Sequence, residues 1–100
     1  MNHEFTVGSL MDRILQYARE VAPKTRTDME RFEALRYFAE DVRRWLDHLP
    51  ELEQQTLLQT MEQYRQHGTA PGIATLQDAG EDRCLKQLMA LILEPPPLLL

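Results

Sequence analysis

Apolar side chains recur at intervals of three and four residues in several stretches of the chain, a spacing that places them on one face of an α-helix. The clearest of these stretches is 28–49. It holds the only tryptophan and two of the three phenylalanines, which are the largest apolar side chains available for a core. Its apolar stripe consists of Phe32, Leu35, Phe38, Ala39, Val42, Trp45, Leu46 and Leu49. We therefore expect the rest of the fold to be organised around this helix.

Both ends of this helix are predicted by its sequence. Thr27 precedes the stripe and Glu30 follows three residues later, which is the pattern of a capping box. Asp28 and Glu30 also place negative charge at the positive end of the helix dipole. Pro50 is expected to end the helix, because proline cannot continue it.

The outer side of the same helix carries charged side chains, and we interpret it as a solvated face. Glu40 and Arg44 lie four residues apart there, in the order that favours an ion pair along a helix. We therefore expect these two side chains to pair.

An earlier stretch, 7–22, fits the same helical template and is followed by Pro23, which ends it. Ser9 and Asp12 form a candidate capping pair, although Gly8 is an alternative start. The connection to the next helix is short, which favours antiparallel packing of the two. The apolar positions of this stretch are Val7, Leu10, Met11, Ile14, Leu15, Ala18, Val21 and Ala22.

A third helix is expected over 50–67. Proline is favoured at the first position of a helix, and Gly68 is a natural C-terminal stop. The apolar stripe is narrow, so this helix is expected to pack on one side only. The stripe consists of Leu57, Leu58, Met61 and Tyr64.

A loop follows, which Ile73 and Leu76 are expected to hold against the core, and a fourth helix is predicted over 79–93. Asp78 and Glu81 are its candidate capping pair. The fourth helix is apolar over a wide arc that extends beyond a single stripe. It is therefore either central to the core or partly covered by a partner.

These elements predict an all-α protein, a compact four-helix bundle formed by one domain over 1–94. Hydrophobic residues make up 43% of the chain and charged residues 27%, a balance typical of globular proteins. Residues 95–100 are predicted to be an extended tail, since three successive prolines stop a helix and favour the polyproline II conformation.

The net charge of −5 is carried entirely by residues 45–100, since the basic and acidic residues of 1–44 balance. Such an acidic half disfavours phosphate backbones and favours basic protein surfaces. The N-terminus lacks the pattern of a signal peptide, and no apolar run has the roughly 20 residues of a membrane span. We expect a cytoplasmic protein with no membrane contact, and the single cysteine fits a reducing compartment.

The sequence offers no pattern for catalysis. Its three histidines, His3, His48 and His67, are scattered, and no pair has the spacing of a helical zinc site. Cys84 is interpreted as a small buried side chain. The glycines lack the spacing of a phosphate-binding loop. We therefore predict no catalytic residues, no metal and no cofactor.

The leading hypothesis is a non-catalytic interaction protein. An apolar fourth helix followed by a leucine-rich tail predicts an exposed apolar patch, and such patches mark association sites. The protein would be a small acidic adaptor or inhibitor docked on a larger assembly, such as one with a basic, nucleic-acid-binding surface. A homodimer formed through the same surface is compatible with this hypothesis. The predicted partner-binding residues are Leu91, Leu93, Leu98, Leu99 and Leu100.

The alternative is a small helical regulator that binds DNA or RNA around the first interhelical turn. Phosphate contacts by basic side chains supply most of the affinity for nucleic acid. The predicted residues are Arg19, Lys24, Arg26 and Arg31. Neighbouring acidic residues dilute this locus, so a protein partner is favoured over nucleic acid.

Overall fold

The computed structural model describes residues 6–70, 73 and 76–95. This part of the chain forms α1 (Val7–Val21), the short 3-10 helix η1 (Ala22–Lys24), α2 (Asp28–Leu46), α3 (Glu51–His67) and α4 (Ala79–Leu93). The predicted all-α fold of four helices is confirmed.

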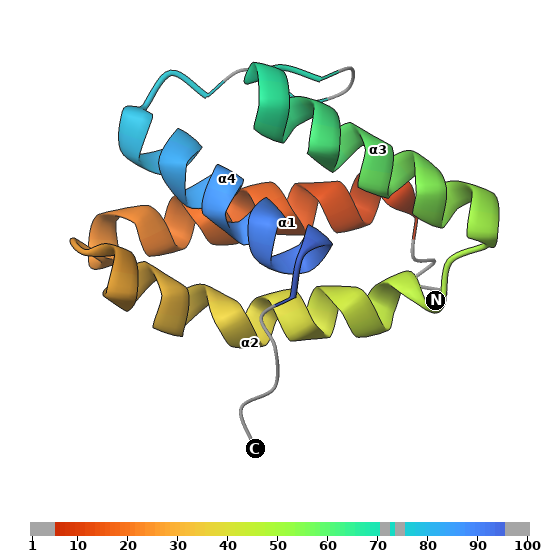
Figure 1. Cartoon of the computed structure of the whole chain (residues 1–100), viewed down its shortest axis with the longest axis horizontal. Coiled ribbons are helices and arrows are strands. Elements are labelled where there is room, and N and C mark those ends of the chain that lie inside the picture. The colour runs from red at the N-terminus through yellow and green to blue at the C-terminus, as the bar shows by residue number, and fades with distance from the viewer. Residues whose placement is uncertain (1–5, 71–72, 74–75, 96–100) are drawn as a thin grey trace.

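The helix at the centre of the fold is α4. It packs against α1, α2 and α3, whereas α2 and α3 lie along opposite edges of the molecule and α1 runs behind α4 (Figure 1). The expectation that 28–49 would organise the others is therefore wrong. All the large apolar side chains of α4 are buried or partly buried, which explains why its apolar arc is so wide.

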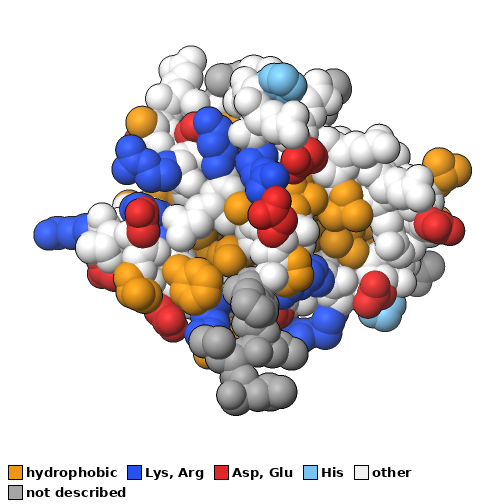
Figure 2. All heavy atoms as spheres, in the orientation of Figure 1, with side chains coloured by type: hydrophobic (Ala, Val, Ile, Leu, Met, Phe, Trp, Pro, Cys, Tyr) orange, Lys and Arg blue, Asp and Glu red, His pale blue; other side chains and the backbone are white. Residues whose placement is uncertain are grey.

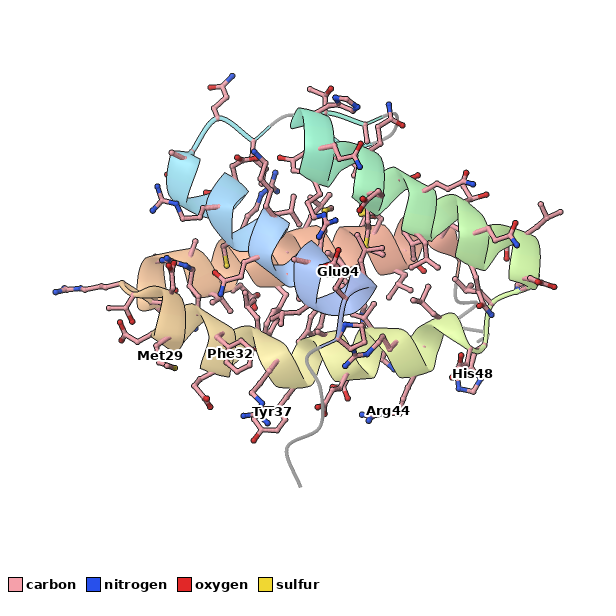
Figure 3. The ribbon with its side chains drawn as sticks, in the orientation of Figure 1. Met29, Phe32, Tyr37, Arg44, His48 and Glu94 are labelled. Atoms are coloured by element: carbon pink, nitrogen blue, oxygen red, sulfur yellow. The ribbon has the colours of Figure 1, made fainter. Side chains whose placement is uncertain are left out.

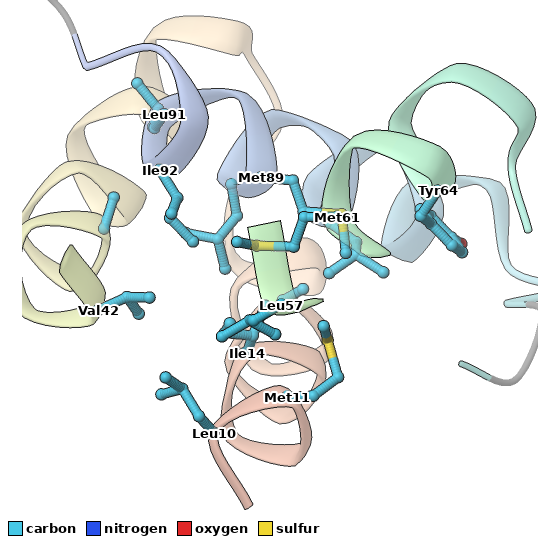
Figure 4. Packing of buried hydrophobic residues seen from close by; sticks show 14 of the residues in the cluster. Leu10, Met11, Ile14, Val42, Leu57, Met61, Tyr64, Met89, Leu91 and Ile92 are labelled. Carbon is cyan, nitrogen blue, oxygen red and sulfur yellow. The ribbon is translucent and has the colours of Figure 1, made fainter. Parts of the chain in front are cut away.

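Apolar side chains from all four helices form one continuous core (Figure 4). The core side chains of α1 lie on the face that its periodicity predicts. Leu10 and Ile14 of this face are fully buried. Ile73 and Leu76 are 7% and 9% exposed, so the connection between α3 and α4 is held against the core as expected.

Capping side chains explain where α1, α2 and α4 begin. Thr27 and Glu30 form the predicted capping box, with 3.1 Å bonds from the N–H of Glu30 to Thr27 Oγ1 and from the N–H of Thr27 to Glu30 Oε1. Asp78 caps α4 by accepting from the N–H of Glu81 at 2.9 Å. In α1 the cap is Thr6, paired with Ser9, so the predicted Ser9–Asp12 pair was placed three residues too late.

Two of the helices end slightly earlier than their apolar patterns suggest, α1 at Val21 and α2 at Leu46. After Leu46 the backbone tightens into a turn, in which the N–H of Leu49 donates to the carbonyl of Leu46 at 3.0 Å. The apolar stripe continues to Leu49 because this turn still points its side chain into the core. Pro50 is the N-cap of α3 and lies just outside the helix. Gly68 ends α3 as predicted, with a left-handed φ of 76° that favours glycine.

Polar side chains, among them Arg31 and Tyr64, connect the outer helices to α4. Arg31 of α2 donates from Nε to Oε1 of Gln87 at 3.1 Å and pairs with Asp28. Tyr64 of α3 is fully buried, and its hydroxyl donates to Asp82 at 2.6 Å. Because both contacts are directional, they fix the positions of α2 and α3 along α4.

Candidate interaction surfaces

A shallow groove of about 480 Å³ lies where α2, α3 and the C-terminal end of α4 meet. Its apolar side chains come from three helices: Leu46 from α2, Leu58 from α3, and Ile92 and Leu93 from α4. Figure 2 shows apolar side chains at the surface between α2 and α3. Leu58 and Leu93 are only partly buried, so they present apolar surface at the groove. We call this feature the α2–α3 groove.

Polar side chains surround the apolar part of the α2–α3 groove. Glu40, Arg43, Arg44 and Asp47 come from α2 and the turn that follows it. Arg43 donates to the carbonyl of Leu91 at 3.2 Å, which satisfies one of the carbonyls left free at the C-terminal end of α4. The groove thus has a small apolar floor and a mixed charged rim, an arrangement that protein interfaces also have.

The predicted apolar anchors occupy different environments. Leu91 is only 9% exposed and belongs to the core, so it offers little surface to a partner. The exposed apolar patch expected on the fourth helix is absent from residues 79–95, because the surrounding helices cover it. Leu93 is partly buried and lines the α2–α3 groove. Leu98, Leu99 and Leu100 lie outside the described residues.

The predicted basic locus is only partly assembled. Lys24 and Arg26 are exposed beside the turn between α1 and α2, and no carboxylate of the described residues forms an ion pair with either. Arg19 lies in the last turn of α1, and its Nε pairs with Oε1 of Glu81 in α4 at 3.4 Å.

Arg31 does not belong to an exposed basic surface. Its side chain is 10% exposed and bonds to Asp28 and Gln87, so it offers little surface to a phosphate backbone. This burial corrects the expectation that Arg31 lies on an exposed basic turn. A sequence signal was available, since Arg31 precedes the buried Leu35 by four residues and therefore lies on the core side of α2.

A second surface runs along the outer side of α2, where the sequence predicts only a charged, solvated face. Met29 is 69% exposed and Tyr37 is 62% exposed. In Figure 3 both project from α2 away from the other helices, with Phe32 between them and Arg44 further along. The guanidinium carbon of Arg36 lies 5.0 Å from the ring centre of Tyr37 and 5.7 Å from that of Phe32, within cation–π range.

Charged side chains alternate in sign along this outer side of α2. Arg36 pairs with Glu33 at 3.6 Å, and Arg44 pairs with Asp41. The predicted pairing of Arg44 with Glu40 is replaced by this Asp41 contact. We call the surface formed by Met29, Glu33, Arg36, Tyr37, Asp41 and Arg44 the outer face of α2.

The partly buried aromatic side chains between α1 and α2 stabilise the packing of these helices. Tyr17 stacks on Phe38 with ring centres 4.0 Å apart, and Phe38 meets Trp45 edge-on at 5.8 Å. The Tyr17 hydroxyl donates to the carbonyl of Ala34 at 2.9 Å, and burial raises its pKa. The guanidinium carbon of Arg13 lies over the Trp45 ring, 5.1 Å from its centre. This cluster therefore has a structural role.

Cys84 and the metal-binding residue types were also located in the described part of the chain. Cys84 is fully buried, and burial raises the pKa of its thiol, which disfavours the nucleophilic thiolate. Within the same residues, no three His, Cys, Asp or Glu side chains gather closely enough to hold a metal ion. No helix there is long and apolar enough to cross a membrane.

Comparisons with protein-family models, with curated proteins and with solved structures found no match to this chain.

Proposed function

We propose that this protein is a non-catalytic interaction module, a small acidic adaptor or inhibitor that docks on a larger protein. The α2–α3 groove is the observation that supports this proposal. Leu58 of α3 and Leu93 of α4 are partly open to solvent there, inside a charged rim. We also propose a cytoplasmic location, in keeping with a lone buried cysteine.

The chemistry of the groove favours a partner that inserts one or two apolar side chains. Leu58 and Leu93 supply the contact surface, and burial of apolar area is the main source of affinity in such sites. The rim carries both carboxylates and guanidinium groups, so it would orient the bound partner more than it would strengthen the binding. The five acidic charges in excess over the whole chain would steer the encounter toward a basic protein surface.

A matched pair of leucine variants tests the groove. Leu58→Asp places a charge in the groove, whereas Leu52→Asp makes the same change on the same helix at a side chain that is 76% exposed. A binding protein captured from cells with the full chain would be purified and titrated against each variant. We expect Leu58→Asp to weaken binding at least about tenfold and Leu52→Asp to leave it unchanged.

Circular dichroism would first establish that both variants keep the helical content of the parent protein. Equal affinities for both folded variants would exclude the groove as the contact. A third chain ending at Glu94 tests the contribution of Leu98, Leu99 and Leu100 as further anchors. If these leucines contact the partner, the shortened chain binds more weakly although its groove is intact.

Binding of DNA or RNA through Lys24 and Arg26 is the second proposal, because both side chains are exposed beside a single turn. Two free basic side chains are few for a phosphate-binding surface, so the expected affinity is low and strongly salt-dependent. Changing Lys24 and Arg26 to Glu together should abolish nucleic-acid binding in a gel-shift assay. The same change should leave capture of a protein partner through the groove intact.

A further inference from the structure

The outer face of α2 has a charge order that is complementary to itself when reversed. Read from the N-terminal end, it runs Glu33, Arg36, Tyr37, Asp41 and Arg44. An antiparallel copy of the same helix would present these residues in the opposite order. Glu33 and Arg44 lie nearly on one line along the helix, so Glu33 of each copy would then face Arg44 of the other.

The spacing along the helix fits a two-fold axis that passes beside α2, at the level midway between Phe38 and Ala39. With a rise of about 1.5 Å per residue, Glu33 and Arg44 each lie about 8 Å from that level, on opposite sides. A parallel arrangement in register would instead place every charge opposite its own like. The charge order therefore selects the antiparallel pairing.

The same face also supplies the apolar surface that an interface needs. Tyr37, at 62% exposed, lies close to the level of the axis, and Met29 lies toward the outer end. Tyrosine, methionine and arginine are the residue types enriched at protein interfaces. Figure 3 shows that the other helices leave this side of α2 uncovered.

We propose that the protein self-associates as an antiparallel dimer through the outer face of α2. Glu33 of each copy contacts Arg44 of the other, and the two Tyr37 side chains pack near the axis. On forming the dimer, Arg44 exchanges its carboxylate partner, since it is paired with Asp41 of its own helix in the monomer. A single helix face buries a small area, so the dimer belongs to the weak, transient class.

The test is a charge exchange between two single variants. Glu33→Arg places a second guanidinium opposite Arg44, and Arg44→Glu places a second carboxylate opposite Glu33, so each variant alone should repel its own copy. In an equimolar mixture, the two variants pair with opposite charges at both positions. Sedimentation equilibrium at up to about 1 mM suits the weak class of interface. We expect the parent protein and the mixture to approach twice the monomer mass, and each variant alone to bind at least about tenfold more weakly.

Glu20→Arg on α1 is the matched control, because it makes the same change in net charge as Glu33→Arg at an exposed side chain outside this face. It should dimerise like the parent protein. A parent protein that stays monomeric at about 1 mM overturns the proposal. Single variants that dimerise as well as the parent, or a mixture that does not recover, overturn it as well. Leu58→Asp leaves this face unchanged, so loss of partner binding and loss of self-association are distinguished.

Discussion

Tyr64 illustrates how one polar atom is accommodated inside the core. Its ring is fully buried between α3 and α4, and its hydroxyl donates to a carboxylate of Asp82 that also pairs with Lys86. Burial, followed by the contact with Asp82, raises the pKa of Tyr64 to about 12. The hydrogen bond and the Lys86 ion pair lower the pKa of Asp82, against the effect of its own burial. Each group thus depends on the protonation state of the other.

Removing the Tyr64 hydroxyl should destabilise the protein moderately. Tyr64→Phe keeps the ring in the core and removes one hydrogen bond to a charged acceptor, for which the expected cost is about 1.5–3 kcal/mol. Urea unfolding followed by circular dichroism measures this loss. Tyr37→Phe is the matched control, since its side chain is exposed, and it should change stability by less than about 0.5 kcal/mol.

The raised pKa of Tyr64 predicts a loss of stability at alkaline pH. In the unfolded chain tyrosine ionises near pH 10, whereas in the folded protein Tyr64 keeps its proton up to about pH 12. The folded state therefore binds more protons between these values, and its stability falls as the pH rises through them. Melting temperatures from pH 9 to 12 should fall more steeply for the parent protein than for Tyr64→Phe. Parallel curves would contradict the assignment.

At the scale of the helix, α4 is buried on several sides, so substitutions of its apolar side chains should lower the free energy of unfolding more than substitutions of exposed side chains on other helices. Leu88 of α4 is fully buried, whereas Leu52 of α3 is 76% exposed. Leu88→Ala should cost about 2–5 kcal/mol, because it removes apolar contacts and leaves a cavity. Leu52→Ala should stay within about 0.5 kcal/mol of the parent. Equal free energies of unfolding for the two variants would show that α4 is not central.

The cap of α2 allows a second prediction at this scale. Thr27→Ala removes the side-chain acceptor for the N–H of Glu30 and should cost about 1 kcal/mol. Thr27→Ser keeps the hydroxyl and should retain most of that stability. The N–H groups of Arg26 and Thr27 lower the pKa of Glu30, so its carboxylate resonance should titrate below its usual range in NMR. A normal titration would indicate that the capping box is open in solution.

The positions of the helices could be predicted from the sequence because each follows from local information. Periodicity indicates the buried face of each helix. Thr27 and Asp78 indicate where α2 and α4 begin, and Gly68 indicates where α3 ends, through contacts within a few residues. Which helix lies at the centre could not be predicted in the same way, since α2 and α4 both have long apolar stripes. The wide arc that includes Leu91 was compatible with burial by neighbours or by a partner.

The candidate surfaces could be predicted only in part. The α2–α3 groove combines Leu58 with Leu93, which come together only through the packing of three helices, so no local pattern could predict it. The outer face of α2 was predictable in principle, since Met29 and Tyr37 are large apolar side chains outside the stripe of their own helix. The charged residues on that side instead favoured the interpretation of a solvated face.

For the molecule as a whole, the common packing of α1, α2 and α3 on α4 predicts a single cooperative unfolding transition. Without α4, the other three helices lose their principal apolar partner. Trp45 fluorescence reports on α2, and circular dichroism in the far ultraviolet reports on all helices. Their urea transitions should coincide in midpoint and slope. Separate midpoints would show that α2 unfolds independently.

The central position of α4 also bears on how the protein is made in the cell. Translation delivers α1, α2 and α3 first, and the helix that they share emerges from the ribosome after all of them. Their apolar faces therefore stay uncovered during much of synthesis, in a form open to chaperones. Once Leu93 has left the exit tunnel, all three faces can be covered together. We therefore expect this domain to complete its folding only after α4 has emerged.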